Sequence, residues 1–162
     1  MNSHDSGSSH KARVAVLMGS ASDESVMKEC IKFLEYFDIS YEVRVLSAHR
    51  NPKDVTAFAV EAPKRGIEVI IAGAGMAAHL PGAVAAHTIL PVIGVPIAGS
   101  PLGGQDALYS MVQMPSGVPV ATVSIGSVGA RNAAILAAEI LALYDPELKK
   151  KLMAFKEKGS KL

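Results

Sequence analysis

The chain alternates short apolar runs with longer segments in which apolar residues recur every three or four positions. Continuous apolar runs at residues 13–18 and 67–72 are typical of strands buried on both faces of a sheet. Shorter apolar or β-branched runs at residues 40–46, 91–95 and 118–125 predict three more strands. Because helical patterns fill the intervals, the chain is expected to form an α/β fold with a parallel five-stranded sheet between two layers of helices.

The intervals between the strands carry helical periodicity. In the first interval the apolar stripe consists of Val26, Cys30, Phe33, Leu34 and Phe37. The second helix begins at Pro52 and is expected to end near Gly66, with Pro63 shortening or kinking its last turn. Two further helices are predicted at residues 105–114 and 130–143.

The helix predicted at residues 130–143 is apolar nearly all round. Such a helix needs burial on more than one side, so part of its burial is expected to come from another subunit. A last amphipathic helix follows Asp145 and is expected to turn Leu148, Leu152 and Phe155 inward.

Composition narrows the class of protein. A chain of 162 residues with a net charge of +1 has room for one sizeable core and no bulk charge that favours nucleic acid or an acidic membrane surface. The single cysteine, Cys30, excludes an intramolecular disulfide framework and a cysteine-based metal cluster. No apolar run reaches transmembrane length, and residues 1–11 lack the apolar core of a signal peptide. We therefore expect a cytoplasmic protein with a disordered N-terminus at 1–11 and a single catalytic α/β domain at 12–162.

The main candidate chemistry follows the second predicted strand. The segment L-S-A-H-R-N-P at 46–52 offers the hydroxyl of Ser47, the imidazole of His49 and the guanidinium of Arg50. Ligands of open α/β sheets bind where strands end and helices begin. Imidazole suits proton transfer near neutral pH, and guanidinium fits phosphate oxygens, so the segment favours proton-transfer chemistry on a phosphorylated small molecule. The alternative is a polar loop in which Asn51 merely caps the next helix.

Two other turns bring polar groups to the same edge of the sheet. After the first strand, residues 19–23 place hydroxyls at a helix N-terminus, which is a ready anion site, although Ser22 or Asp23 would also serve as simple caps. After the third strand, the small residues at 73–82 let backbone amides approach a ligand closely. His79 adds a second imidazole to this loop. Its side chain could take part in the chemistry, or it could only support the loop. The convergence of three such turns predicts a functional site.

Four motifs together resemble a known enzyme family. They are G-S-x-S-D at 19–23, S-A-H-R-x-P at 47–52, G-A-G-x-A-A-H-L-P-G at 73–82 and V-Q-M-P-x-G-V-P at 112–119. In this order they look like the motifs of the class I N5-carboxyaminoimidazole ribonucleotide mutases of purine biosynthesis, and the resemblance extends over residues 13–145. It implies a flavodoxin-like three-layer α/β/α sandwich, here with an extra C-terminal helix. It further implies a homo-octamer that uses neither a metal nor an organic cofactor.

The resemblance also assigns substrate-binding residues. Ser20, Ser22 and Arg50 would hold the 5′-phosphate of an aminoimidazole ribonucleotide, and Asp23 would accept hydrogen bonds from the ribose hydroxyls. The wall around the base and the carbon dioxide would consist of Ala74, Gly75, Met76, Ala77 and Leu80.

The implied reaction moves a carboxylate from the exocyclic nitrogen of the aminoimidazole to a ring carbon. Ser47 and His49 would face the aminoimidazole ring of the substrate, with His49 as the proton shuttle and His79 as a further catalytic candidate. One group of near-neutral pKa can protonate the nitrogen as carbon dioxide leaves and later accept the ring-carbon proton. A dry pocket of small residues would keep the gas from escaping between the two steps.

The sequence departs from the family pattern at three positions. Met76 replaces a usual glycine and would narrow the pocket if its side chain pointed inward, Asn51 replaces a commoner threonine, and Ser127 replaces a usual lysine. Within the family the rival is an animal-type carboxylase that uses free carbon dioxide, but that branch carries lysine at the position of Arg50. A non-catalytic nucleotide or flavin-binding module is the alternative from another class. A flavin site should offer aromatic faces, and the predicted turns contain none.

Overall fold

The computed structural model describes residues 11–162, so the predicted disordered N-terminus lies, apart from Lys11, outside the described residues. One parallel five-stranded sheet has the order β2-β1-β3-β4-β5. Its strands are β1 (Val14–Met18), β2 (Tyr41–Val45), β3 (Val69–Gly75), β4 (Val92–Ile97) and β5 (Ala121–Thr122). This is the flavodoxin-like strand order, and the predicted fold class is confirmed.

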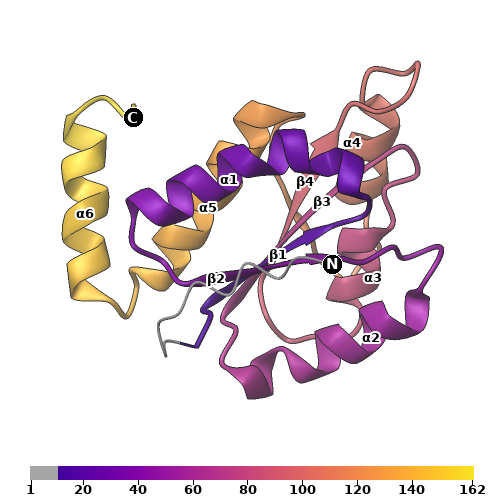
Figure 1. The fold of residues 1–162 in the computed structure, drawn as a ribbon, viewed down its shortest axis with the longest axis horizontal. Helices are drawn as coiled ribbons and strands as arrows, with labels where there is room; N and C mark the ends of the chain where they lie inside the picture. The colour runs from indigo at the N-terminus through magenta and orange to yellow at the C-terminus, as the bar shows by residue number, and fades with distance from the viewer. Residues whose placement is uncertain (1–10) are drawn as a thin grey trace.

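Helices cover both faces of the sheet (Figure 1). One layer contains α1 (Glu24–Tyr36) and α5 (Ser127–Leu141), which pack against each other. The other contains α2 (Pro52–Glu61), α3 (Leu80–Ala85) and α4 (Gln105–Val112). The last helix, α6 (Pro146–Glu157), stands beyond the end of α1 and α5. None of the helices in residues 11–162 is long and apolar enough to cross a bilayer.

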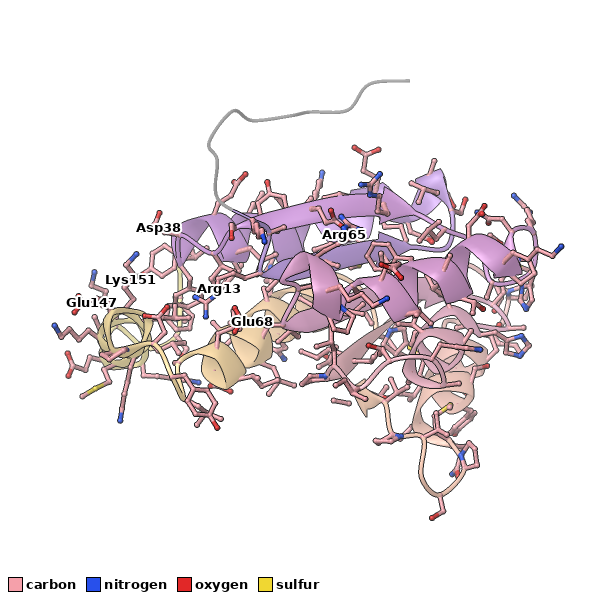
Figure 2. The ribbon with its side chains drawn as sticks, turned by 90° about the horizontal axis from the view of Figure 1, so that it is seen from below. Arg13, Asp38, Arg65, Glu68, Glu147 and Lys151 are labelled. Carbon is pink, nitrogen blue, oxygen red and sulfur yellow. The ribbon has the colours of Figure 1, made fainter. Side chains whose placement is uncertain are left out.

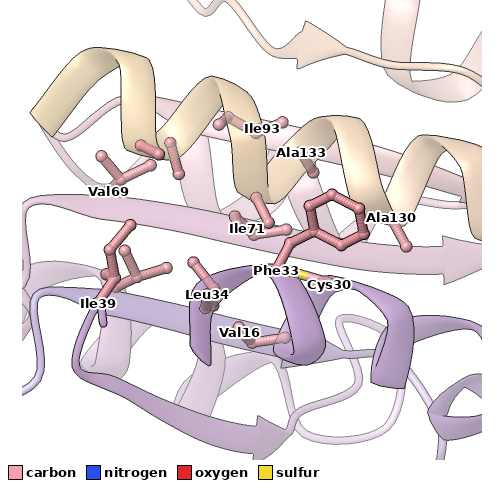
Figure 3. Packing of buried hydrophobic residues seen from close by; sticks show 14 of the residues in the cluster. Val16, Cys30, Phe33, Leu34, Ile39, Val69, Ile71, Ile93, Ala130 and Ala133 are labelled. Carbon is pink, nitrogen blue, oxygen red and sulfur yellow. The ribbon is translucent and has the colours of Figure 1, made fainter. Parts of the chain in front are cut away.

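Side-chain alternation along the strands builds two cores. On β1, Val14 and Val16 belong to the core beneath α1 and α5, whereas Ala15 and Leu17 belong to the core beneath α2 and α3. Figure 3 shows the first of these cores, where Phe33 of α1 lies against the α5 layer. Burial on both faces explains why β1 and β3 appear in the sequence as unbroken apolar runs.

Prolines set the differences between several predicted and observed element bounds. The predicted second helix divides at Pro63, so that α2 ends at Glu61 and a short 3₁₀ helix, η2 (Pro63–Arg65), follows. The predicted strand at 118–125 is wrong in length, because only Ala121–Thr122 pairs with β4. Pro119 has no N–H to donate, which prevents the ladder from starting earlier.

Helix α5 is buried on one face within its own chain. Its alanine face is fully buried, and Ile135, Leu136 and Ile140 on its flanks are half-buried against the same core. At the start of the helix, Gly129 lies tightly against the preceding turn, because a Cβ there would lie 1.6 Å from the carbonyl oxygen of Ser124. The apolar pattern of α5 therefore reflects packing inside the subunit as well as any contact outside it.

Helix α6 also packs on its own chain. Phe155 is completely buried and meets Phe37 of the α1 end edge-on, with ring centroids 5.4 Å apart. Asp145 caps α6 by accepting from the Leu148 N–H at 3.0 Å, and its other oxygen accepts from Arg13 at 2.8 Å. Figure 2 shows Arg13 at the α6 end of the molecule, near the ion pair between Lys151 and Asp38.

Candidate active site

A cavity of about 450 Å³ opens where β1, β2 and β3 end, at the carboxyl edge of the sheet. This volume suits a small-molecule ligand. Its lining comes from the turns after four strands and consists of Gly19, Ser20, Ser22, Asp23, Ser47, Ala48, His49, Arg50, Ala74, Gly75, Met76, Ala77, His79, Leu80 and Gly99.

The turn after β1 brings two hydroxyls and a buried carboxylate to the cavity. Ser20 and Asp23 form a capping box on the short 3₁₀ helix η1 (Ala21–Asp23): the Ser20 hydroxyl accepts from the Ser22 N–H, and Asp23 Oδ2 accepts from the Ser20 N–H at 2.9 Å. Asp23 is only 7% exposed. Burial raises the pKa of its carboxyl, partly offset by hydrogen bonds from the backbone at Ser20 and Gly19 and from the Ser22 side chain.

The loop after β2 carries His49 and Arg50, both exposed. Asn51 precedes α2, as predicted, but its side chain makes no capping hydrogen bond to the helix. Asn51 Oδ1 instead accepts from the Ser47 N–H at 2.8 Å. Within residues 11–162 the guanidinium of Arg50 forms no ion pair with any carboxylate, so its charge faces the cavity without a protein counter-ion.

The wall after β3 is built from small residues and begins inside the strand. The structure corrects the predicted loop at 73–82, because β3 continues through Gly75. Gly73 serves packing rather than ligand approach, since a Cβ there would lie 2.5 Å from Met27 Sδ. Met76 lines the cavity, is 60% exposed and has a φ of 57°, in the left-handed region that favours glycine. That backbone conformation explains why glycine is the easier residue here.

Two histidines meet at the mouth of the cavity. His49 Nε2 lies 2.5 Å from His79 Nδ1, and the ring planes cross at 76°. His79 directly precedes α3, so the turn after β3 presents it to the loop after β2. The contact lets a proton pass between two imidazoles at the edge of a ligand-sized cavity.

All of the site residues predicted from the sequence line this one cavity. The prediction omitted Gly19, Ala48 and Gly99, which line it as well. Gly99 lies in the Gly/Pro/Ser-rich loop that follows β4, and this composition was the available signal for a fourth converging turn. The described residues contain no group of three or more His, Cys, Asp or Glu side chains arranged to hold a metal ion.

The fold and the cavity define a doubly wound α/β protein whose polar turns converge at the carboxyl edge of the sheet. The chain belongs to the AIR carboxylase family, whose model matches residues 13–161. The family predicted from the four motifs is thus confirmed.

Several relatives with high identity carry the same name, N5-carboxyaminoimidazole ribonucleotide mutase. The protein of Saccharolobus solfataricus is 59% identical over 145 residues, which cover 90% of this chain and 90% of its own length. That of Escherichia coli K12 is 51% identical over 147 residues, covering 91% of this chain and 87% of its own. The crystal structure of Treponema denticola PurE matches with a TM-score of 0.82 and 32% identity, covering 91% of this chain and 90% of that one.

Proposed function

We propose that this protein is an isomerase, an N5-carboxyaminoimidazole ribonucleotide mutase of purine biosynthesis. It converts its substrate into 4-carboxy-5-aminoimidazole ribonucleotide by decarboxylation and recarboxylation. The observation that carries the proposal is the cavity in which Arg50, the His49–His79 pair and a wall of small residues face one another. Relatives with 50–59% identity that bear the mutase name support it.

Substrate binding is divided between the turns. The guanidinium of Arg50 and the hydroxyls of Ser20 and Ser22 hold the 5′-phosphate, since a charged fork and hydroxyl donors match phosphate oxygens. The carboxylate of Asp23 accepts hydrogen bonds from the ribose hydroxyls. Burial disfavours a charged carboxylate, so a ligand that donates to it offsets part of this cost.

The reaction needs one proton, which returns to where it started. His49 protonates the exocyclic nitrogen, the nitrogen–carboxylate bond breaks, and carbon dioxide and the neutral aminoimidazole remain in the cavity. The ring carbon then attacks carbon dioxide, and its proton passes back to His49. The migrating carbon keeps its oxidation level, so acid–base groups suffice for the chemistry.

The neighbours of His49 support both halves of this cycle. His79, within hydrogen-bonding distance, orients the His49 ring and can hold the exchanged proton inside the site. The hydroxyl of Ser47 faces the aminoimidazole and positions it. Ala74, Gly75, Met76, Ala77 and Leu80 form the wall that confines carbon dioxide, and confinement favours recombination over escape.

A direct aminoimidazole ribonucleotide carboxylase that takes up free carbon dioxide is the second candidate, favoured by the description of the family model as AIR carboxylase. The two are separated by comparing kcat/KM for the carboxyamino substrate with kcat/KM for aminoimidazole ribonucleotide plus bicarbonate, both without ATP. We expect a higher kcat/KM for the carboxyamino substrate, with little early incorporation of labelled bicarbonate. A faster reaction with aminoimidazole ribonucleotide at modest bicarbonate contradicts the mutase assignment.

The alternative from another class, a flavin-binding module, is tested by colour. A protein with bound flavin is yellow after purification, and we expect a colourless protein.

We also infer a homo-octamer located in the cytoplasm. The resemblance to the mutases supports the octamer, and so do the exposed apolar side chains of Leu102, Tyr109 and Val112 in and before α4. A monomer by light scattering at micromolar concentration contradicts this assembly. The proposed location rests on the substrate. A ribonucleotide with a charged phosphate does not diffuse through a bilayer, so the enzyme must share the compartment that makes it, which we propose is the cytoplasm.

A further inference from the structure

Asn51 closes the loop that carries His49 and Arg50, two of the predicted site residues. Its Oδ1 accepts from the Ser47 N–H at 2.8 Å, and the Asn51 N–H donates to the Ser47 carbonyl at 3.0 Å. These two hydrogen bonds tie the ends of residues 47–51 into a ring, with His49 and Arg50 at its tip.

A second contact fixes which way the Asn51 amide points. Its Nδ2 donates to Asp54 Oδ2 at 3.2 Å on the first turn of α2. An ionised carboxylate only accepts, so the amide nitrogen must face Asp54 and the amide oxygen must face Ser47. The side chain of Asn51 thus joins the loop to the helix instead of capping it.

Apart from the ring closed by Asn51, a few contacts among residues 11–162 hold the tip of the loop. His49 and Arg50 are exposed, and neither belongs to the two buried cores. The described contacts of the tip are the approach of His49 to His79, the packing of Ala48 against the core beneath α2 and α3, and a hydrogen bond of 3.3 Å from the Arg50 N–H to Ser47 Oγ. The ring closed by Asn51 therefore helps to set where His49 meets His79 and where Arg50 lines the cavity.

We propose that Asn51 is a positioning residue of this site. Its side-chain amide holds the loop in the shape that places His49 for proton transfer and Arg50 for the phosphate. This inference rests on the proposed function for the reaction that is followed, but the shape of the loop can be measured without it.

The test compares three variants of the full-length protein. Asn51→Leu keeps the side-chain size and removes both polar contacts. The double variant Asn51→Asp/Asp54→Asn keeps an acceptor for the Ser47 N–H, keeps a bond to position 54 with its direction reversed, and leaves the net charge unchanged. Lys53→Ala is the matched control, because Lys53 is an exposed residue of the same helical turn and makes no side-chain hydrogen bond within residues 11–162.

We expect Asn51→Leu to lower kcat by about 10- to 100-fold, since misplacing a catalytic group by about 1 Å costs on the order of a hundredfold. KM should rise in the same variant, because one loop carries both His49 and Arg50. The double variant should recover kcat to within about threefold of wild type, as expected where the acceptor bond is restored, and Lys53→Ala should match wild type. The Ser47 amide should exchange hydrogen faster only in Asn51→Leu, with the melting temperature within a few degrees of wild type.

The inference is overturned by wild-type kcat in Asn51→Leu, or by unchanged Ser47 exchange in that variant. It is also overturned if the double variant is as impaired as Asn51→Leu, because the lost rate then does not depend on the acceptor bond. If the wild-type protein does not convert the carboxyamino substrate, the proposed function fails, and Ser47 exchange across the three variants still decides the inference.

Discussion

His49 Nε2 and His79 Nδ1 lie 2.5 Å apart, although the two residues are 30 positions apart in the chain and follow different strands. Only one hydrogen fits between the two nitrogens, so one ring donates while the other accepts. The edge-on approach of the rings, with centroids 4.7 Å apart, joins the loop after β2 to the turn after β3. Substitution of either histidine should therefore also alter the orientation and hydrogen bonding of the other ring.

Replacing His49 with asparagine tests the proton shuttle. His49→Asn keeps a polar side chain of similar size but cannot exchange a proton near neutral pH, so kcat should fall by at least about a hundredfold. Product affinity, measured by calorimetry, should change little. The matched control is His87→Asn, because His87 is also exposed but its ring bonds to the Ala83 carbonyl and does not line the cavity. Near-wild-type turnover in His49→Asn would refute the assignment.

The Arg50→Lys variant tests phosphate recognition. Lysine keeps the charge but loses the two-pronged fork, so affinity for the ribonucleotide should fall by about tenfold. Affinity for the unphosphorylated riboside should stay the same. Arg44→Lys, at an exposed arginine of β2 outside the cavity, should alter neither affinity. Equal weakening of both ligands by Arg50→Lys would mean that the phosphate binds elsewhere.

The carboxylate of Asp23 is expected to lower the stability of the folded protein while it contributes to ribonucleotide binding. Because burial raises the pKa of Asp23 in the folded state above its usual 3.8, folding disfavours the ionised form. The cost is absent below the unfolded-state pKa, grows as pH rises between the two pKa values and is complete above the folded-state pKa. Asp23→Asn should therefore be more resistant to urea than wild type at pH 7, with the gap closing near pH 3, while ribonucleotide affinity falls. Lower stability of the variant at pH 7 would contradict this sign.

At position 76 a glycine variant should be more stable than an alanine variant, which reverses the usual order of stability. At its φ of 57° a Cβ is strained, so Met76→Gly should be more stable than Met76→Ala by about 1 kcal/mol. At Lys150, an exposed residue of α6, the same pair should show the opposite order, with glycine less stable by about 1 kcal/mol. Urea denaturation of the four variants measures both differences. The same order at both positions would show that the backbone at Met76 is not strained.

Asp145 should make the attachment of α6 sensitive to acid. The backbone N–H of Leu148 and the guanidinium of Arg13 lower the pKa of Asp145 below its usual 3.8. Its contribution to stability is thus complete above the unfolded-state pKa and is lost as pH falls through the folded-state pKa. Asp145→Ala should cost on the order of 1 kcal/mol at pH 7 and should release α6 to limited proteolysis. A cost that persists unchanged at the lowest pH would contradict a role for the carboxylate.

The sequence identified the layered fold because buried parallel strands leave an unmistakable pattern. The unbroken apolar run of β1 follows from burial of Val16 on one face and Leu17 on the other. The predicted fifth strand is too long at both ends, and Pro119, which has no N–H to donate, accounts for its late start. The apolar pattern of α5 predicts burial but does not say which surface supplies it, so a contribution from another subunit stays a prediction.

The site could be located from the sequence because every strand of a parallel sheet ends at the same edge. That rule predicts that Ser20, His49 and His79 lie at one edge of the sheet, and all three line the cavity. It could not reveal the contact between Asn51 and Ser47, because a side chain before a helix can bond in either direction along the chain. Nor could it show that Gly73 makes room for Met27, since that packing involves a distant segment.

The cavity draws its lining from turns that begin at Gly19 and end at Gly99, and this has a consequence for how the protein acquires activity. Each pair of neighbouring turns is separated by a strand–helix crossover, so the contacts that shape the site are remote in sequence and form slowly. A chain in which β4 and the loop behind it have not yet docked has every acid–base group of the site but lacks the part of the cavity wall that Gly99 supplies. Enzymatic activity should thus return last during refolding, after helical content and compactness have already recovered.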